Sequence, residues 1–394
     1  MTPKTTSTNE SQGSVARKKR PAQHESKLAK TPQRGESLPA ALVISVGCPA
    51  GIGPEVAVAA ACQRSRSKRR KSENAEPCVL IADLDTLKQA CRSLGVRESC
   101  LCPMDPAADL TALCARKPGR LWFHDPGVKV GARDRKPGAP SKRSGQAQLA
   151  WVEAGYALTK RLGHAALVTG PVSKAAIAAS GSPGAEQFLG HTEWLQAMDH
   201  AQSSVMCFAA QALTTSLVTT HLPLHDVSSR IREEAVAEAI LALAELVQAL
   251  GKVSPRIAVC SLNPHAGESE LLGDEERLAI VPGILRARKQ LGRRVELIGP
   301  MGAETAYRKA FKGEYAGVVA MYHDQATIPM KLVAFGDAVN VTAGLSIVRT
   351  SVDHGTGYDI AWRGVADPGG MRAALDLGAA LVERRRLSRG RVRS

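Results

Sequence analysis

The stretch GVVAMYHDQ (317–325) contains the pattern that repeats along the chain. An apolar run of strand length, 317–321, is followed at once by Tyr322, His323 and Asp324. Similar apolar runs alternate with segments of helical periodicity, and this alternation predicts an α/β fold with a largely parallel sheet covered by helices. The predicted strands are 42–46, 79–82, 121–124, 165–169, 205–209, 216–219, 257–261, 295–298 and 317–321, and the predicted helices are 54–62, 84–94, 146–162, 233–250, 274–291 and 304–311.

Two further predicted strands also end in a histidine. His221 follows the strand 216–219, and His265 follows the strand 257–261. In open α/β sheets the carboxyl ends of strands collect ligand-binding residues. Three neutral imidazoles suit a divalent metal and leave coordination positions open for a substrate. A single histidine is more often structural, so the prediction depends on convergence of His221, His265 and His323.

The charge of the chain lies mostly at its ends. The formal net charge is +15, and basic residues concentrate in 1–39, 64–71 and 384–394. We therefore expect a disordered basic tail over 1–39, a loop insertion at 64–71 and a basic C-terminal tail over 384–394. Aromatic residues make up only 4% of the chain, too few for an extended base-stacking surface. A nucleic-acid partner is therefore unlikely on composition.

The cysteines and the apolar segments indicate a cytoplasmic protein. The nine cysteines form no CxxC pair, which fits a reducing compartment better than a disulfide framework. The first 39 residues lack the apolar core of a secretory signal. The most apolar long stretch, 236–250, is interrupted by Glu238 and Glu245 and has the period of an amphipathic helix. No membrane span is predicted.

Seven segments, in order, resemble a known family. They are GCPAGIGPEV (47–56), VTGPVSKAAI (168–177), GHTEWL (190–195), TTHLPLHDV (219–227), LNPHAGE (262–268), MYHDQATIPMKL (321–332) and VNVTAGLSIVRTSVDHGTGYDIA (339–361). In order and spacing they look like the PdxA family, the 4-hydroxythreonine-4-phosphate dehydrogenases and their 4-phospho-threonate dehydrogenase relatives. The resemblance runs from about Ala41 to Ala380 and leaves out the tails and 64–71.

The resemblance implies a set of site residues. It makes His221, His265 and His323 the metal ligands, with one of the three donated by the partner subunit of a homodimer. A phosphorylated, carboxylate-bearing substrate needs cationic and amide donors, and arginine pairs with such oxygens through two parallel hydrogen bonds. The residues that the resemblance assigns to substrate binding are His191, Thr192, Lys331, Asn340 and Arg349.

The nicotinamide site is less distinctive in the sequence. No GxGxxG fingerprint is present, and the glycine-rich loop 47–55 is at least as well explained as a structural turn as a phosphate cradle. The segment 353–361 is similar to the HGSAPDIA-type NAD loop of isopropylmalate and isocitrate dehydrogenases. By that similarity His354, Gly355 and Thr356 approach NAD or NADP.

These resemblances imply a two-domain α/β fold like that of isopropylmalate dehydrogenase, with an interdomain cleft. The first domain comprises 40–165 plus 330–383, and the second comprises 166–329. The implied reaction uses a divalent metal (zinc, cobalt or magnesium) and NAD or NADP to oxidise C3 of 4-phosphohydroxy-L-threonine. Decarboxylation then gives 3-amino-2-oxopropyl phosphate, a precursor of pyridoxal phosphate. Lys174 and Asp324 are candidate bases, but Asp324 is equally suited to orient His323, so the catalytic base is unassigned.

Three alternatives remain open at this point. The chain is a dehydrogenase of 4-phospho-threonate or another phosphorylated hydroxy acid, a non-catalytic protein that binds nucleic acid through its basic tails, or an acyltransferase of related fold. Two departures from the family pattern also stand out. Cys48 replaces an acidic residue and Trp362 replaces a glycine. Neither departure touches the three histidines.

Overall fold

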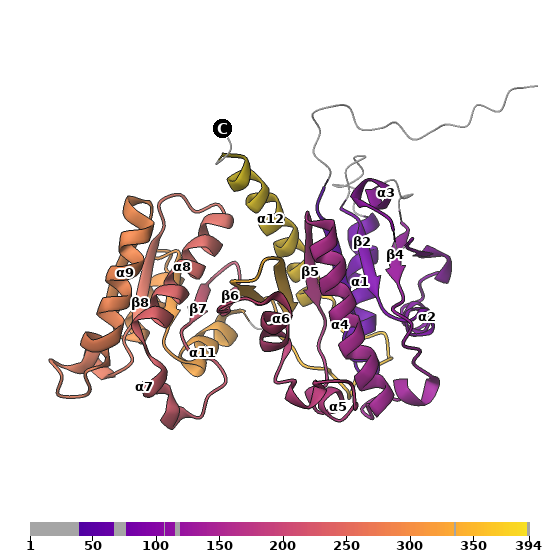
Figure 1. The fold of residues 1–394 in the computed structure, drawn as a ribbon, viewed down its shortest axis with the longest axis horizontal. Helices are drawn as coiled ribbons and strands as arrows, with labels where there is room; N and C mark the ends of the chain where they lie inside the picture. The colour runs from indigo at the N-terminus through magenta and orange to yellow at the C-terminus, as the bar shows by residue number, and fades with distance from the viewer. Residues whose placement is uncertain (1–38, 67–75, 106, 115–118, 335, 392–394) are drawn as a thin grey trace, which may run out of the picture. The chain divides into compact units, whose positions relative to one another are not determined.

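The computed structural model describes residues 39–66, 76–105, 107–114, 119–334 and 336–391. Within these ranges twelve strands form one sheet in the order β3-β4-β2-β1-β5-β12-β11-β6-β7-β10-β8-β9 (Figure 1). The strands are β1 (Ala41–Ser45), β2 (Cys78–Ile81), β3 (Leu101–Pro103), β4 (Leu121–His124), β5 (Ala165–Thr169), β6 (Val205–Ala209), β7 (Thr214–Leu217), β8 (Arg256–Cys260), β9 (Glu296–Met301), β10 (Gly317–Ala320), β11 (Val339–Ala343) and β12 (Val348–Val352).

Helices occupy the connections between these strands. They are α1 (Gly53–Arg66), α2 (Leu84–Ser93), α3 (Leu110–Cys114), α4 (Lys142–Leu162), α5 (Lys174–Ala178), α6 (His191–Asp199), α7 (Val227–Arg230), α8 (Glu233–Ala249), α9 (Val281–Leu291), α10 (Ala303–Phe311), α11 (His323–Ala334) and α12 (Gly369–Arg391). In the described ranges no helix is long and apolar enough to cross a membrane. The α/β fold class and every predicted strand and helix are confirmed, with shifted ends.

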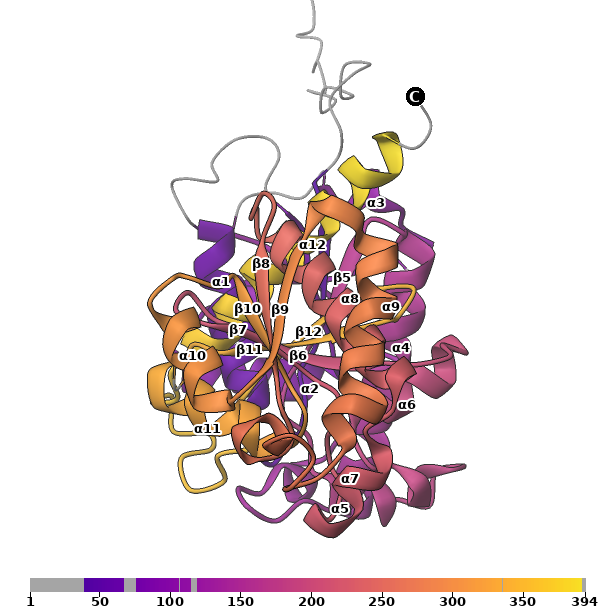
Figure 2. The same ribbon diagram turned by 90° about the vertical axis from the view of Figure 1, so that its left-hand side faces the viewer.

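The sheet is parallel except around two central strands. β11 pairs antiparallel with both β12 and β6, and β6 pairs antiparallel with β7. The other strand pairings in the described ranges are parallel, as predicted. Figure 2 shows how strongly the sheet twists, because its strands fan around one point in that view. Since all twelve strands share one sheet, the domain boundaries at 165/166 and 329/330 stay a prediction.

Opposite faces of the sheet pack against different helices. Thr350 of β12 donates a hydrogen bond to the Ala374 carbonyl of α12 (2.9 Å), so this residue faces α12. Leu167 of β5 faces the other side, where a Cβ at Gly155 of α4 would stand 2.9 Å from its Cδ1. Side chains alternate along a strand. Arg349, next to Thr350, therefore shares the Leu167 face.

Two basic segments differ from their predicted form. Residues 64–66 are the last turn of α1, and the Arg64 side chain is buried in ion pairs with Asp376 of α12 and Glu76. Arg64 therefore belongs to the fold instead of to a solvated insertion. Residues 384–391 continue α12 instead of forming an extended tail. The predicted tail over residues 1–38, like residues 67–71 of the insertion, lies outside the described residues.

The glycine-rich loop 47–53 is held against the segment that follows β12. Glu55, only 1% exposed, accepts hydrogen bonds from the backbone N–H groups of Trp362 (2.5 Å) and Gly364 (2.8 Å). Trp362 has φ of 61°, a left-handed conformation that favours glycine and explains why a glycine suits this position. Its indole N–H donates to the Pro49 carbonyl (3.0 Å), a contact that glycine lacks.

Replacing Glu55 with alanine should destabilise the fold by about 2–4 kcal/mol, because two buried backbone donors lose their acceptor. Denaturant unfolding of the purified variant measures this loss. Glu304, which also lies in the first turn of a helix but with a side chain 73% exposed, is the matched control. Equal, small losses for Glu55→Ala and Glu304→Ala would contradict the assigned importance of the Glu55 contacts.

Candidate active site at the ends of the central strands

The three predicted metal ligands follow neighbouring strands. β10 pairs in parallel with β7 on one side and with β8 on the other, so the three strands end at the same edge of the sheet. His221 and His323 meet there, with ring centroids 5.6 Å apart and planes inclined by 42°. His265 lies in a short 3-10 turn, Pro264–Gly267, with φ of 50°.

The structure does not gather all three histidines within one chain. In the part of the chain that the structure describes, no group of three or more His, Cys, Asp or Glu side chains is close enough to hold a metal ion. The pair formed by His221 and His323 is therefore an incomplete ligand set. The local backbone of His265 is nonetheless unusual, since Ala266 and Glu268 also have positive φ.

A carboxylate lies beside one nitrogen of each paired histidine. Asp324 Oδ1 is 2.8 Å from His323 Nδ1, and Glu193 Oε1 is 3.8 Å from His221 Nδ1. Contact with His221 lowers the pKa of Glu193, so this side chain is ionised at neutral pH. An imidazole whose Nδ1 faces a carboxylate keeps Nε2 available for another group. The contact with Asp324 thus orients the His323 ring as carboxylates orient metal-binding histidines, whereas Glu193 is a more distant neighbour of His221.

Three basic side chains, two of them cationic, lie near Glu193. The fold brings Lys174 at the start of α5, His191 at the start of α6 and Arg349 on β12 close enough to affect one another electrostatically. Gly190 allows this approach, because a Cβ there would stand 2.9 Å from Glu193 Oε2 and 3.6 Å from Lys174 Nζ. Burial, Arg349 and Lys174 together hold the pKa of His191 well below its usual range. His191 is therefore neutral.

Arg349 is buried, and its guanidinium contacts the strands on either side of β12. It is 3% exposed, and its guanidinium donates to the hydroxyls of Thr342 (2.9 Å) and Thr169 (2.7 Å). Its Nε and Oδ1 of Asn340 are buried without a hydrogen-bond partner among the described residues. Burial lowers the pKa of Arg349 to about 10, which still leaves it charged at neutral pH. Buried polar atoms without partners are the groups that a polar ligand would satisfy.

The two remaining predicted substrate residues, Lys331 and Thr192, differ in exposure. Lys331 is exposed on α11, the helix that begins with His323, and lies near enough to Asp353 for its charge to act on that carboxyl. Burial is the larger effect and raises the pKa of Asp353. Thr192 is half-buried in the first turn of α6.

The predicted nicotinamide segment packs on the glycine-rich loop. The Thr356 carbonyl accepts from the Ile52 N–H (2.8 Å), and a Cβ at Gly51 would stand 2.5 Å from that carbonyl oxygen. Gly51 is thus required for close backbone packing, which supports the structural interpretation of this loop. His354 Nδ1 is 2.9 Å from the Gly355 carbonyl, and its Nε2 is buried without a partner in the described ranges. Cys48 belongs to this loop and is buried, with its sulfur 3.8 Å from the Tyr358 hydroxyl.

Two acidic residues of this region were not singled out from the sequence. Glu193 stands beside His191 in the GHTE segment, and Asp353 stands beside His354 in the VDHGT segment. Their position in the sequence could have identified them, because each lies within a motif already noted and next to, or two residues from, a predicted site residue. Only the folded chain pairs Glu193 with His221, 28 positions along the sequence.

The neutral state of His191 predicts a pH-dependent stability. In the unfolded chain this histidine takes up a proton near pH 6.5, whereas in the folded protein it resists protonation. Stability from this residue is therefore complete above the unfolded pKa and falls as the pH drops below it, by at most about 1.4 kcal/mol per pH unit. His191→Gln should show a shallower loss than the unmodified chain in urea unfolding between pH 6.5 and 5. Parallel curves for the two proteins would refute the assignment.

Known proteins share both the sequence and the fold of this chain. The curated 4-hydroxythreonine-4-phosphate dehydrogenase of Xanthomonas oryzae is 40% identical over 348 residues, covering 87% of this chain and 99% of that protein. The D-threonate 4-phosphate dehydrogenase of Salmonella typhimurium is 34% identical, over 86% and 98%. A crystal structure of 4-hydroxythreonine-4-phosphate dehydrogenase from Klebsiella pneumoniae superposes with a TM-score of 0.70 at 30% identity, over 87% and 99%.

A family model gives the same result. The model described as "Pyridoxal phosphate biosynthetic protein PdxA" matches residues 73–378. The predictions of the family and of a dehydrogenase are thereby confirmed. The chain belongs to the PdxA family and is an oxidoreductase of the dehydrogenase type.

Proposed function

We propose that the chain oxidises the C3 hydroxyl of 4-phosphohydroxy-L-threonine with NAD or NADP, and that the product loses carbon dioxide to give 3-amino-2-oxopropyl phosphate. The observation that carries the proposal is the contact between His221 and His323 beside a group of cationic side chains. The names of the relatives supply the substrate. The product is a precursor of pyridoxal phosphate, in agreement with the description of the family.

The donor set fits a divalent metal such as zinc, cobalt or magnesium. His221 and His323 offer imidazole nitrogens, the ring of His323 is oriented by Asp324, and Glu193 lies near His221. We propose that His265 belongs to the same ligand set and that a second copy of the chain completes it in a homodimer. A metal held here would supply a Lewis acid that favours ionisation of the substrate hydroxyl.

The chain's own residues would bind and orient the substrate. Arg349 and Asn340 present unpartnered buried polar atoms, and Lys331 adds an exposed cation for the phosphate or the carboxylate. Neutral His191 and Thr192 would donate or accept hydrogen bonds at the first turn of α6.

The proton acceptor is a choice between two side chains. Asp324 is engaged with His323 Nδ1, which favours an orienting role for this carboxylate. Lys174 is the other candidate, and it would accept the hydroxyl proton only as a neutral amine, so neither side chain is assigned as the base. Hydride would pass to a nicotinamide ring held near His354, Gly355 and Thr356, whose backbone packs on the glycine-rich loop.

A second candidate substrate is a 4-phosphorylated threonate. The Salmonella relative named for D-threonate 4-phosphate is 34% identical to this chain, and relatives named for 4-hydroxythreonine 4-phosphate are 34% to 40% identical. The two substrates differ in an amino group and share the phosphate, the carboxylate and the oxidised alcohol. The residues proposed for metal and phosphate binding therefore serve either molecule.

Replacing His221 with alanine should lower kcat/KM for 4-phosphohydroxy-L-threonine at least about 100-fold and reduce the metal content of the purified protein. Elemental analysis and the absorbance of the reduced nicotinamide measure the two effects. His225 is the matched control, because it lies four residues further on with a side chain 81% exposed. Full activity of His221→Ala in protein free of metal would exclude the proposed metal site.

Initial rates with NAD and with NADP on the two substrates test the identity of the substrate. We expect kcat/KM for 4-phosphohydroxy-L-threonine to exceed that for D-threonate 4-phosphate by at least about tenfold, which corresponds to about 1.4 kcal/mol of transition-state discrimination. The reverse ratio would assign the chain to the second substrate. No nicotinamide reduction with either, in metal-loaded protein, would reject both.

A further inference from the structure

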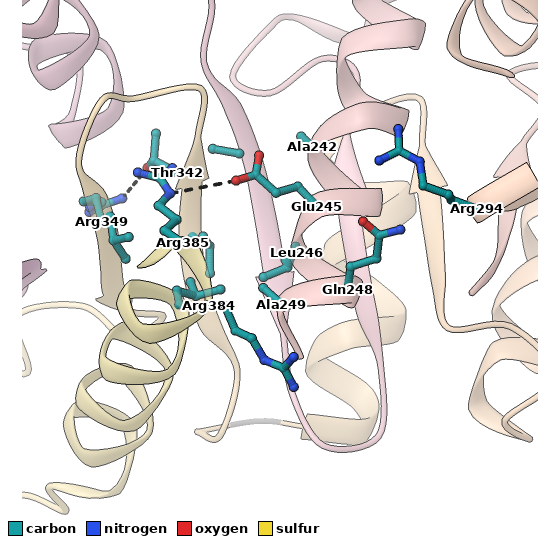
Figure 3. A pocket seen from close by; sticks show the side chains of 14 residues that line it. Ala242, Glu245, Leu246, Gln248, Ala249, Arg294, Thr342, Arg349, Arg384 and Arg385 are labelled. Carbon is teal, nitrogen blue, oxygen red and sulfur yellow. Dashed lines mark hydrogen bonds and ion pairs between the residues drawn. The ribbon is translucent and has the colours of Figure 1, made fainter. Parts of the chain in front are cut away.

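A separate pocket of about 480 Å³ opens between α8, α12 and the strands β11 and β12 (Figure 3). Its apolar surface comes from all of these elements, and the side chains of Leu246, Val341, Val348 and Leu381 are each less than 9% exposed. Its size is that of pockets that enclose small organic molecules. The residues that give the pocket its apolar character are Ala242, Leu246, Ala249, Val341, Ala343, Val348 and Leu381.

Three arginines accompany this apolar surface. Arg294, Arg384 and Arg385 line the pocket, whereas Glu245 is its one acidic lining residue. In Figure 3 Arg384 and Arg385 extend from α12 toward α8, and Arg294 stands on the far side of α8. The pocket therefore combines an apolar interior with an excess of positive charge at its edge.

Arg384 and Arg385 differ in their contacts with the described residues. Arg385 Nε lies 3.8 Å from Glu245 Oε1, a long distance for an ion pair, and its other nitrogens reach the carbonyls of Leu345 and Ser346 at 3.3–3.4 Å. Arg384 has no carboxylate within 4.0 Å in the described part of the chain. Its Nη2 reaches the end of α8, 3.3 Å from the place of a Cβ on Gly251. Its guanidinium is thus available to an anion.

The pocket lies on the opposite side of the sheet from the proposed substrate site. Val348 and Thr350 share the strand face that packs on α12, whereas the Arg349 guanidinium turns to Thr342 and Thr169 on the other face. Arg349 and Thr342 both border the pocket, and the Arg349 guanidinium is hydrogen-bonded to the Thr342 hydroxyl (Figure 3). A ligand in the pocket would therefore not occupy the position proposed for the substrate.

We propose that this pocket binds an organic monophosphate with an apolar body. The phosphate would pair with Arg384, since guanidinium groups bind phosphate oxygens through paired hydrogen bonds. The apolar body would cover Leu246, Val341 and Val348. Neither an inorganic anion nor a neutral apolar compound would use both halves of the pocket.

Calorimetric titration of the purified full-length protein with 1-naphthyl phosphate tests the proposal. We expect binding at one site per chain in the micromolar range, with inorganic phosphate and 1-naphthol at least about tenfold weaker. Arg384→Ala removes an exposed cation and Ala249→Trp fills the pocket from α8, and each should weaken binding at least about tenfold. Arg293→Ala is the matched control, because this exposed arginine adjoins Arg294 but does not line the pocket.

The possible results separate the explanations. Binding that is unchanged in both Arg384→Ala and Ala249→Trp would overturn the proposal, because the probe would then occupy another site such as the one near Arg349. Equal binding of inorganic phosphate would also overturn it by showing a general anion site. Circular dichroism of both variants shows whether they are folded. Since the assay measures binding alone, its outcome does not depend on the proposed dehydrogenase reaction.

Discussion

The parallel pairing of β10 with β7 and β8 is the constraint on which the candidate site depends. It places the ends of three strands at one edge of the sheet, and the residues that follow them include His221, His265 and His323. The imidazoles of His221 and His323 then lie next to each other. The strands themselves are buried, so the positions of these side chains are set by the core of the protein.

Burial of Arg349 imposes a second constraint on the same region. A buried guanidinium is costly unless hydrogen bonds and opposite charge compensate it. Two threonine hydroxyls and the nearby Glu193 supply part of that compensation, yet Nε stays without a partner in the described ranges. Glu193 also lies beside His221 and close to Lys174. The cations of this region therefore share one carboxylate, and the site favours an anionic ligand.

Much of this arrangement was predictable because it follows from local pattern. Apolar runs with polar ends predicted nine of the twelve described strands, and motif order gave the candidate site residues. The edge strand β3 was not predicted, nor were β11 and β12, in which Asn340, Thr342, Arg349 and Ser351 interrupt the apolar pattern with polar residues on one face. Thr342, Arg349 and Ser351 are buried because their strands lie in the middle of the sheet, and the sequence pattern carries no information on strand order. Likewise Arg64 looked like part of a solvated basic run, and its partner Asp376 lies 312 positions away.

The separation of His265 from the other two histidines has a physical consequence. Strand order brings the ends of β7, β10 and β8 to one edge, but the turn after β8 has several residues with positive φ and directs His265 by its own geometry. A sequence pattern reports which strand a residue follows and carries no information on the path of such a turn. His221 and His323 alone leave most of the coordination sphere of a metal open. The proposed homodimer supplies the missing ligand, because His265 of a second copy would approach the pair formed by His221 and His323. The pair within one chain is compatible with that proposal.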